Sequence, residues 1–89
     1  MLKPRALEQI IRGFSNHKRI EVLDLLDKKP ELSVTEVARE LKMTLKLSSA
    51  HLKRLIMAGL IMKKSEGRKI RHKLTTRGKY TLKFIKKLN

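Results

Sequence analysis

Cysteine and tryptophan are absent from the 89 residues, and only two prolines and four glycines occur. The lack of cysteine excludes disulfides, thiolate metal sites and thiol redox switches. No apolar run approaches the roughly 20 residues that a membrane-spanning helix needs. Residues 1–5 are not followed by the continuous apolar core of a signal peptide. We therefore expect a soluble protein that is located in the cytoplasm.

Acidic residues are also scarce, because 8 Asp and Glu stand against 23 Lys and Arg, for a net charge of +15. The imbalance lies almost wholly in one half of the chain. Residues 1–41 hold eight basic and seven acidic side chains, whereas residues 42–89 hold fifteen basic side chains and one acidic one, Glu66. A surface that is only solvated mixes both signs. The surplus therefore indicates a polyanionic partner, which is nucleic acid or a membrane surface.

The length suits a single domain, which we place over residues 1–89. Pro4 favours the first turn of a helix, and Gly13 offers a position at which that helix ends. A second helix follows, with Ser15 or Asn16 as its cap. Ser33 and Glu36 then form a capping box, which predicts a third, short helix ending near residue 41.

The next helix is predicted over residues 45–58, with Thr44 as its cap. Its spacing of about 100° per residue divides it into two sides. The side expected to face the core carries Leu45, Ser48, Leu52, Leu55 and Ile56. The opposite side carries Lys46, Leu47, Ala50, Lys53, Arg54 and Met57.

After this helix the pattern changes to the alternation of strands. Residues 60–65 and 70–74 predict a basic hairpin, and Thr75 or Thr76 caps a last helix. A minimal strand at residues 32–33 would complete a small sheet. The fold class is mainly α with a small antiparallel β-hairpin, in the order α-α-α-α-β-β-α, which is that of a winged helix-turn-helix.

A helix-turn-helix places its second helix in the major groove of DNA, which is about 12 Å wide, and the preceding helix orients it. The hairpin then serves as a wing that meets phosphates or a neighbouring minor groove. Arg54 is the candidate for base readout, because its guanidinium can contact both acceptors of guanine. The predicted DNA-binding residues are Thr44, Lys46, Leu47, Ser49, Ala50, Lys53, Arg54, Lys63, Lys64, Arg68, Lys69 and Arg71.

Several segments resemble known regulators. Residues 16–26 resemble the second helix of ArsR-type winged-helix regulators, and residues 32–41 resemble their positioning helix. Residues 49–61, with S-x-H-L and A-G-L-I, are similar to the recognition segment of that family. Residues 74–79 are more similar to the close of MarR- and PadR-type winged helices. The resemblance implies a dimeric, DNA-binding regulator of transcription, and we expect it to repress by covering a promoter.

The chain also departs from the ArsR pattern. Ser33 and Thr35 occupy the places where ArsR-type metal sensors have cysteines, so we expect no metal ion and no cofactor. Leu45 and Leu47 stand where polar residues are usual, and Ser48 stands where an apolar one is usual. Leu47 therefore has two interpretations, contact with a thymine methyl group or inward packing after a small rotation of the helix.

The two terminal helices carry more apolar residues than a small core needs. Their side chains either belong to the core of one chain or form an isologous homodimer, which is the interpretation we prefer. The residues concerned are Ile10, Ile11, Phe14, Tyr80, Phe84 and Leu88.

Two other functions fit the same sequence. The first is a non-specific architectural protein that binds nucleic acid, and the second is a winged helix that binds an acidic protein. An enzyme is not expected, because no paired carboxylates, nucleophile elbow or phosphate loop occur. The predicted partners are double-stranded DNA and a second copy of the chain, with no membrane partner.

Overall fold

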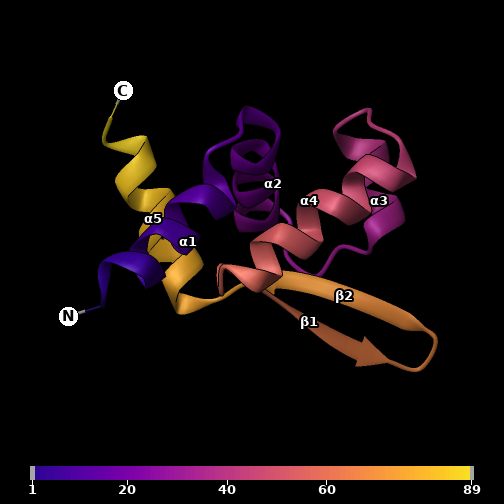
Figure 1. The fold of residues 1–89 in the computed structure, drawn as a ribbon. Helices are drawn as coiled ribbons and strands as arrows, with labels where there is room; N and C mark the ends of the chain where they lie inside the picture. The colour runs from indigo at the N-terminus through magenta and orange to yellow at the C-terminus, as the bar shows by residue number, and fades with distance from the viewer. Residues whose placement is uncertain (1, 89) are drawn as a thin grey trace.

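The computed structural model describes residues 2–88, and its element order is the predicted one. The elements are α1 (Pro4–Phe14), α2 (His17–Lys28), α3 (Val34–Glu40), α4 (Leu45–Met57), β1 (Ile61–Glu66), β2 (Lys69–Leu74) and α5 (Thr76–Lys86). Helices α1 and α5 lie at the end of the molecule that holds both termini, and the hairpin extends away below α4 (Figure 1). None of the helices in the described part is long and apolar enough to cross a bilayer.

The predicted caps are present at four helix starts. The Asn16 side chain accepts from the backbone of Lys18 at 2.9 Å and so begins α2. The Ser33 hydroxyl accepts from the Glu36 backbone at 3.2 Å, and the Glu36 carboxylate accepts from the Ser33 backbone at 2.9 Å. The hydroxyl of Thr44 caps α4, and that of Thr75 caps α5. Each accepts a hydrogen bond from the backbone N–H three residues later. These bonds satisfy N–H groups that a helix leaves unpaired in its first turn.

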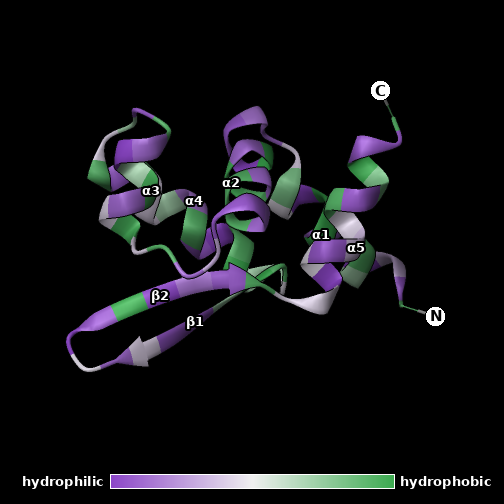
Figure 2. Cartoon of the chain, turned by 180° about the vertical axis from the view of Figure 1, so that it is seen from behind, coloured by the Kyte–Doolittle hydropathy of each residue, from purple (hydrophilic) through white to green (hydrophobic). Residues whose placement is uncertain are grey.

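The core lies between α2, α3, α4, the base of the hairpin and α5. Strand β1 pairs antiparallel with β2, from Ile61 opposite Leu74 to Glu66 opposite Lys69. In place of the predicted minimal strand at residues 32–33, the described structure has a single antiparallel bridge between Leu32 and His72 beside the two-stranded sheet. The core side chains are Val22, Leu23, Leu26, Val37, Leu52, Leu55, Ala58, Leu60, Ile61, Leu74 and Leu82. Figure 2 shows the hairpin as a largely hydrophilic arm outside this body.

Gly13 does not end α1, which continues to Phe14. Gly13 is buried in the last turn of α1. A Cβ at this position would overlap the Cβ of Ala58, the C-cap residue of α4. The absence of a side chain at Gly13 therefore allows α1 to pack closely against the end of α4. The prediction that Gly13 ends α1 is wrong.

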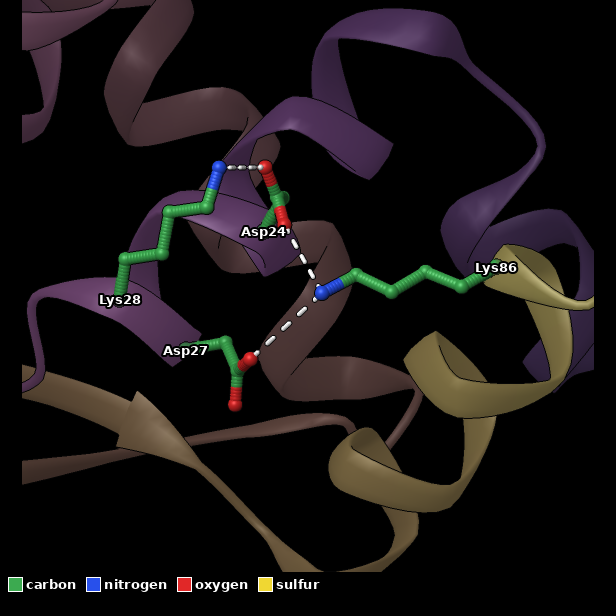
Figure 3. A network of polar contacts seen from close by, with 4 residues as sticks. All are labelled: Asp24, Asp27, Lys28 and Lys86. Atoms are coloured by element: carbon green, nitrogen blue, oxygen red, sulfur yellow. Dashed lines mark hydrogen bonds and ion pairs between the residues drawn. The ribbon is translucent and has the colours of Figure 1, made fainter.

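Helix α5 is held on α2 by a group of charged side chains (Figure 3). The Lys86 ammonium lies 3.3 Å from one oxygen of Asp24 and 3.7 Å from Asp27, while Lys28 lies 3.0 Å from the other oxygen of Asp24. The hydrogen bond from Lys28 lowers the pKa of Asp24, desolvation opposes this effect, and the bond from Lys86 lowers the pKa further. These pairs are largely exposed, so they orient α5 more than they stabilise it.

The junction of α3 and α4 depends on a buried hydroxyl. Ser48 is fully buried, and its Oγ donates to the backbone oxygen of Val34 at 2.8 Å. Leu45, expected on the same inner side, is 54% exposed, so that part of the prediction is wrong. The small serine fills the space between the two helices, and the first turn of α4 extends beyond it into solvent.

We expect Ser48→Ala to lower the free energy of unfolding by about 1–3 kcal/mol, because it removes a buried hydrogen bond. The neighbouring Ser49→Ala is the matched control: Ser49 is exposed, and an exposed site changes stability by about 0.5 kcal/mol at most. Urea unfolding followed by circular dichroism measures both, and equal midpoints for the two variants would contradict the assigned role.

Candidate nucleic-acid interface

The outer face of α4 presents two lysines at a spacing of two helical turns. Ser48, Leu52 and Leu55 turn inward and are buried. The opposite side is therefore fixed toward solvent, and it carries the exposed residues Lys46, Ala50, Lys53 and Met57. An exposed basic side with a small residue at its centre suits a helix that enters a groove between phosphate backbones.

Leu47 and Thr44 lie at the N-terminal end of this face. Leu47 is 51% exposed, so inward packing is wrong, and its side chain is free to meet an apolar group of a ligand. The Thr44 hydroxyl accepts from the Leu47 backbone at 3.1 Å while Thr44 remains exposed. Thr44 therefore serves α4 as a cap whether or not it contacts DNA.

The two flanks of α4 differ. One faces the hairpin across a shallow groove, whose lining includes Ser49, Lys53, Met57, Lys63 and Ile70. The other faces α1, where a second groove is lined by Arg5, Glu8, Gln9, Arg12, Gly13, Arg54, Met57 and Ala58. Arg54 thus lies in the last turn of α4 beside α1, whereas base contacts usually come from the first turns of such a helix. Its role in base readout remains a prediction.

The basic residues of the hairpin do not share one face. Successive strand residues point to opposite sides, and in this register Lys63 pairs with His72 while Lys64 pairs with Arg71. Lys63 thus faces α4, and Lys64 lies on the other face with Arg71 and Lys69. Arg68 lies in the exposed turn at the tip. The five cations of the hairpin are therefore divided between two faces and a tip.

Most cations of this region have no carboxylate partner. Within residues 2–88, ion pairs hold Arg71 to Glu66 at 3.3 Å but involve none of the other predicted contacts. The pairs elsewhere use the acids of α1, α2 and α3. The positive charge of α4 and the hairpin is left available to a ligand.

The N-terminus of α3 lies near the hairpin. The backbone and side-chain hydrogen bonds from Ser33 lower the pKa of Glu36, and the charges of Lys69 and Arg71 add to this. The Glu36 carboxylate therefore stays ionised, and it offsets part of the positive charge at the outer end of β2.

The three histidines lie in different surroundings. His72 is buried, and its Nδ1 lies 2.9 Å from the Leu32 oxygen, so that this nitrogen carries the hydrogen. His51 lies on α4 opposite the first turn of α2, where His17, Lys18 and Arg19 bring further positive charge. The proximity of residues 17–19 to His51 was not predicted from the sequence, because acidic residues balance the charge of the first half of the chain. The run His17-Lys18-Arg19 was the signal that could have indicated it. In the described residues, no three histidine or carboxylate side chains gather to hold a metal ion.

A family model for winged helix-turn-helix DNA-binding proteins matches residues 15–62, which span α2, α3, α4 and the start of β1. The chain belongs to this family. The predicted fold class and the resemblance to winged-helix regulators are thereby confirmed. Family and fold are those of DNA-binding transcription regulators rather than enzymes.

Solved structures share the fold of this winged helix. The homodimeric winged helix-turn-helix domain of Mb0332 from Mycobacterium bovis, a possible ArsR-family regulator, has a TM-score of 0.86 at 22% identity, over 94% of this chain and 78% of that one. HlyU from Vibrio cholerae has a TM-score of 0.79 at 26% identity, over 94% and 88%.

FabT from Streptococcus pneumoniae, solved in complex with DNA, has a TM-score of 0.73 at 24% identity, over 80% of this chain and 52% of that one. A MarR-family regulator also shares the fold, with a TM-score of 0.77 at 22% identity, over 92% of this chain and 56% of that one. The comparison with curated proteins gave no match.

Proposed function

We propose that this winged helix is a homodimeric, sequence-specific regulator of transcription that binds double-stranded DNA and represses by covering a promoter. Helix α4 enters the major groove, and the hairpin contacts the backbone or the neighbouring minor groove. The observation that carries the proposal is the exposed basic side of α4 beside the hairpin. Among residues 2–88, the cations of these two elements have no carboxylate partner, with the exception of Arg71. Both elements have the size and charge that a groove and its phosphates require.

The homodimer is supported by apolar residues that stay exposed in the single chain. Tyr80 and Phe84, one turn apart on α5, are 70% and 58% exposed, and Ile11 on α1 is 54% exposed. The domain of Mb0332, which has the same fold, is homodimeric. A twofold dimer through these helices spaces two α4 helices by about one turn of DNA, roughly 34 Å, and so requires an inverted-repeat site. One domain over residues 1–89 and a cytoplasmic location are part of this proposal.

Selection of binding sites from a random duplex library tests the whole proposal. The purified protein is expected to enrich an inverted repeat, and its affinity for that site is expected to fall with salt at a slope of about −0.9 per phosphate contact. A regulator prefers its site over random DNA by about a thousandfold or more. Tight binding without enrichment would indicate an architectural protein instead, and no duplex binding would overturn the proposal.

Arg54→Ala and Lys64→Ala separate base readout from phosphate contact. We expect Arg54→Ala to cost about 1–3 kcal/mol on the selected site and to relax the preference for it, because a bidentate contact to guanine is lost. Lys64→Ala is expected to weaken selected and scrambled duplexes alike and to reduce the salt slope by about one contact. Competition binding with matched and scrambled duplexes measures both. If Arg54→Ala weakened all duplexes equally, its side chain would be assigned to the backbone.

A further inference from the structure

The groove between α4 and the hairpin has the size of a binding site for a small molecule. Its volume is about 470 Å³, and sites for small molecules commonly measure about 300–1,000 Å³. Side chains from α3, α4, β1 and β2 line it together. The groove therefore lies between the helix that is proposed to enter DNA and the wing beside that helix.

Apolar side chains form most of the lining of this groove. Met57 on α4 and Ile70 on β2 are 57% and 46% exposed, so apolar surface here contacts water in the single chain. Ile70 lies on the face of the hairpin that is directed at α4, because strand alternation places it on the same side as Lys63. Removal of such surface from water favours binding of an apolar group. The apolar residues that line the groove are Val34, Leu52, Ile56, Met57 and Ile70.

Two lysines give the same groove a positive charge. Lys53 on α4 and Lys63 on β1 both line it, and both are exposed. Within residues 2–88, neither lysine has a carboxylate partner, and the lining of the groove includes no acidic residue. A ligand that complements the groove therefore has an apolar body and an anionic group.

We propose that this groove binds a small organic acid with an apolar body, and that the bound acid competes with DNA. Lys53 and Lys63 attract its carboxylate, while the apolar side chains of the groove cover its body. Both lysines are also predicted contacts of DNA, so the acid and the duplex require the same cations. Binding of the acid stands by itself, whereas the competition rests on the proposed function.

Octanoate is a suitable probe, because it combines one carboxylate with a short apolar chain. Methyl NMR of the full chain follows its binding through Met57 and Ile70 in the groove, with Met62 on the other face of the hairpin as the internal reference. We expect octanoate to shift the signals of Met57 and Ile70 saturably, with a Kd of about 1 mM or lower, and to leave the signal of Met62 in place. Octanol lacks the charge and acetate lacks the apolar body, so each is expected to bind at least about tenfold more weakly.

The variant I70N replaces an apolar side chain of the groove that is not among the predicted DNA contacts. It is expected to bind octanoate about tenfold more weakly and to keep its affinity for the selected duplex. M62N is the matched control, because it makes a similar change at an exposed residue on the other face of the hairpin. With octanoate at about ten times its Kd, the duplex affinity of the unmodified protein and of M62N is expected to fall about tenfold, and that of I70N about twofold. Fluorescence anisotropy at constant ionic strength measures these affinities.

The ligand site and the proposed function fail separately in this test. The ligand site is overturned, with the proposed function intact, if octanoate produces no saturable shift or binds no better than octanol and acetate. It is also overturned if the signals of Met57 and Ile70 respond only to the duplex, which would assign the groove to DNA, or only to protein concentration, which would assign it to a second copy. Saturable octanoate binding with unchanged duplex affinity overturns the competition. Saturable octanoate binding by a protein that binds no duplex overturns the proposed function and supports the ligand site.

Discussion

Reversing both lysines of the outer α4 face, K46E/K53E, is expected to abolish specific duplex binding. Lys46 and Lys53 lie two turns apart, are exposed and have no ion-pair partner in the described chain. Each charge-assisted hydrogen bond contributes about 1.5–3 kcal/mol. Loss of two such bonds weakens binding by at least about a hundredfold, and two new carboxylates facing phosphates add repulsion to this loss.

The fold is expected to survive this double variant, because exposed substitutions change stability by about 0.5 kcal/mol or less. Thermal unfolding followed by circular dichroism checks that point, and anisotropy with the selected duplex measures the loss of affinity. The matched control is K79E/K83E, which makes the same change in net charge on α5. Exposed Lys79 and Lys83 line a groove with Asp27 and lie outside the DNA-facing elements. Equal losses for the two double variants would show that only net charge matters and that α4 does not enter the groove.

The local signals of the sequence predicted the elements well. Helix caps act within four residues, so the Ser33–Glu36 box and the Thr44 cap are readable directly from the chain. The alternation of the hairpin likewise set which strand residues share a face. The positions that prediction missed all depend on contacts between distant segments. Gly13 reads locally as a helix end, and only its approach to Ala58 explains why a glycine lies inside α1.

The candidate site shows the same division. Helical periodicity placed Lys46 and Lys53 together correctly on the exposed side of α4. Periodicity wrongly placed Leu45 on the buried side of α4. The contact of α4 with α3 is made one turn later, at Ser48, through its hydrogen bond to Val34, which lies 14 residues away in the sequence. The flank containing His51 was missed for a similar reason. Residues 17–19 lie near His51 only because α2 packs on α4, and the local sequence pattern does not predict this packing.

Phe84→Glu is expected to convert the dimer to a monomer and to weaken binding of the inverted repeat by about a hundredfold or more. Phe84 lies one turn from Tyr80 on an apolar side of α5, and both are more than half exposed in the single chain. In an isologous interface each copy contributes one glutamate. Both carboxylates would therefore be buried without a cationic partner. Once the copies separate, each half-site is bound independently, and the gain of about 10²–10⁴ from linked binding is lost.

Light scattering coupled to size exclusion measures the mass, and anisotropy with full and half sites measures the binding. The single chain is expected to stay folded, because position 84 lies outside the core of one copy. Lys79→Glu is the control: it changes the net charge by more than Phe84→Glu does, and it lies on the side of α5 that faces Asp27. It is expected to leave the mass at that of a dimer. A Phe84→Glu protein that remained dimeric would place the interface elsewhere, and one that became monomeric yet kept full affinity for the repeat would mean that binding does not depend on dimerisation.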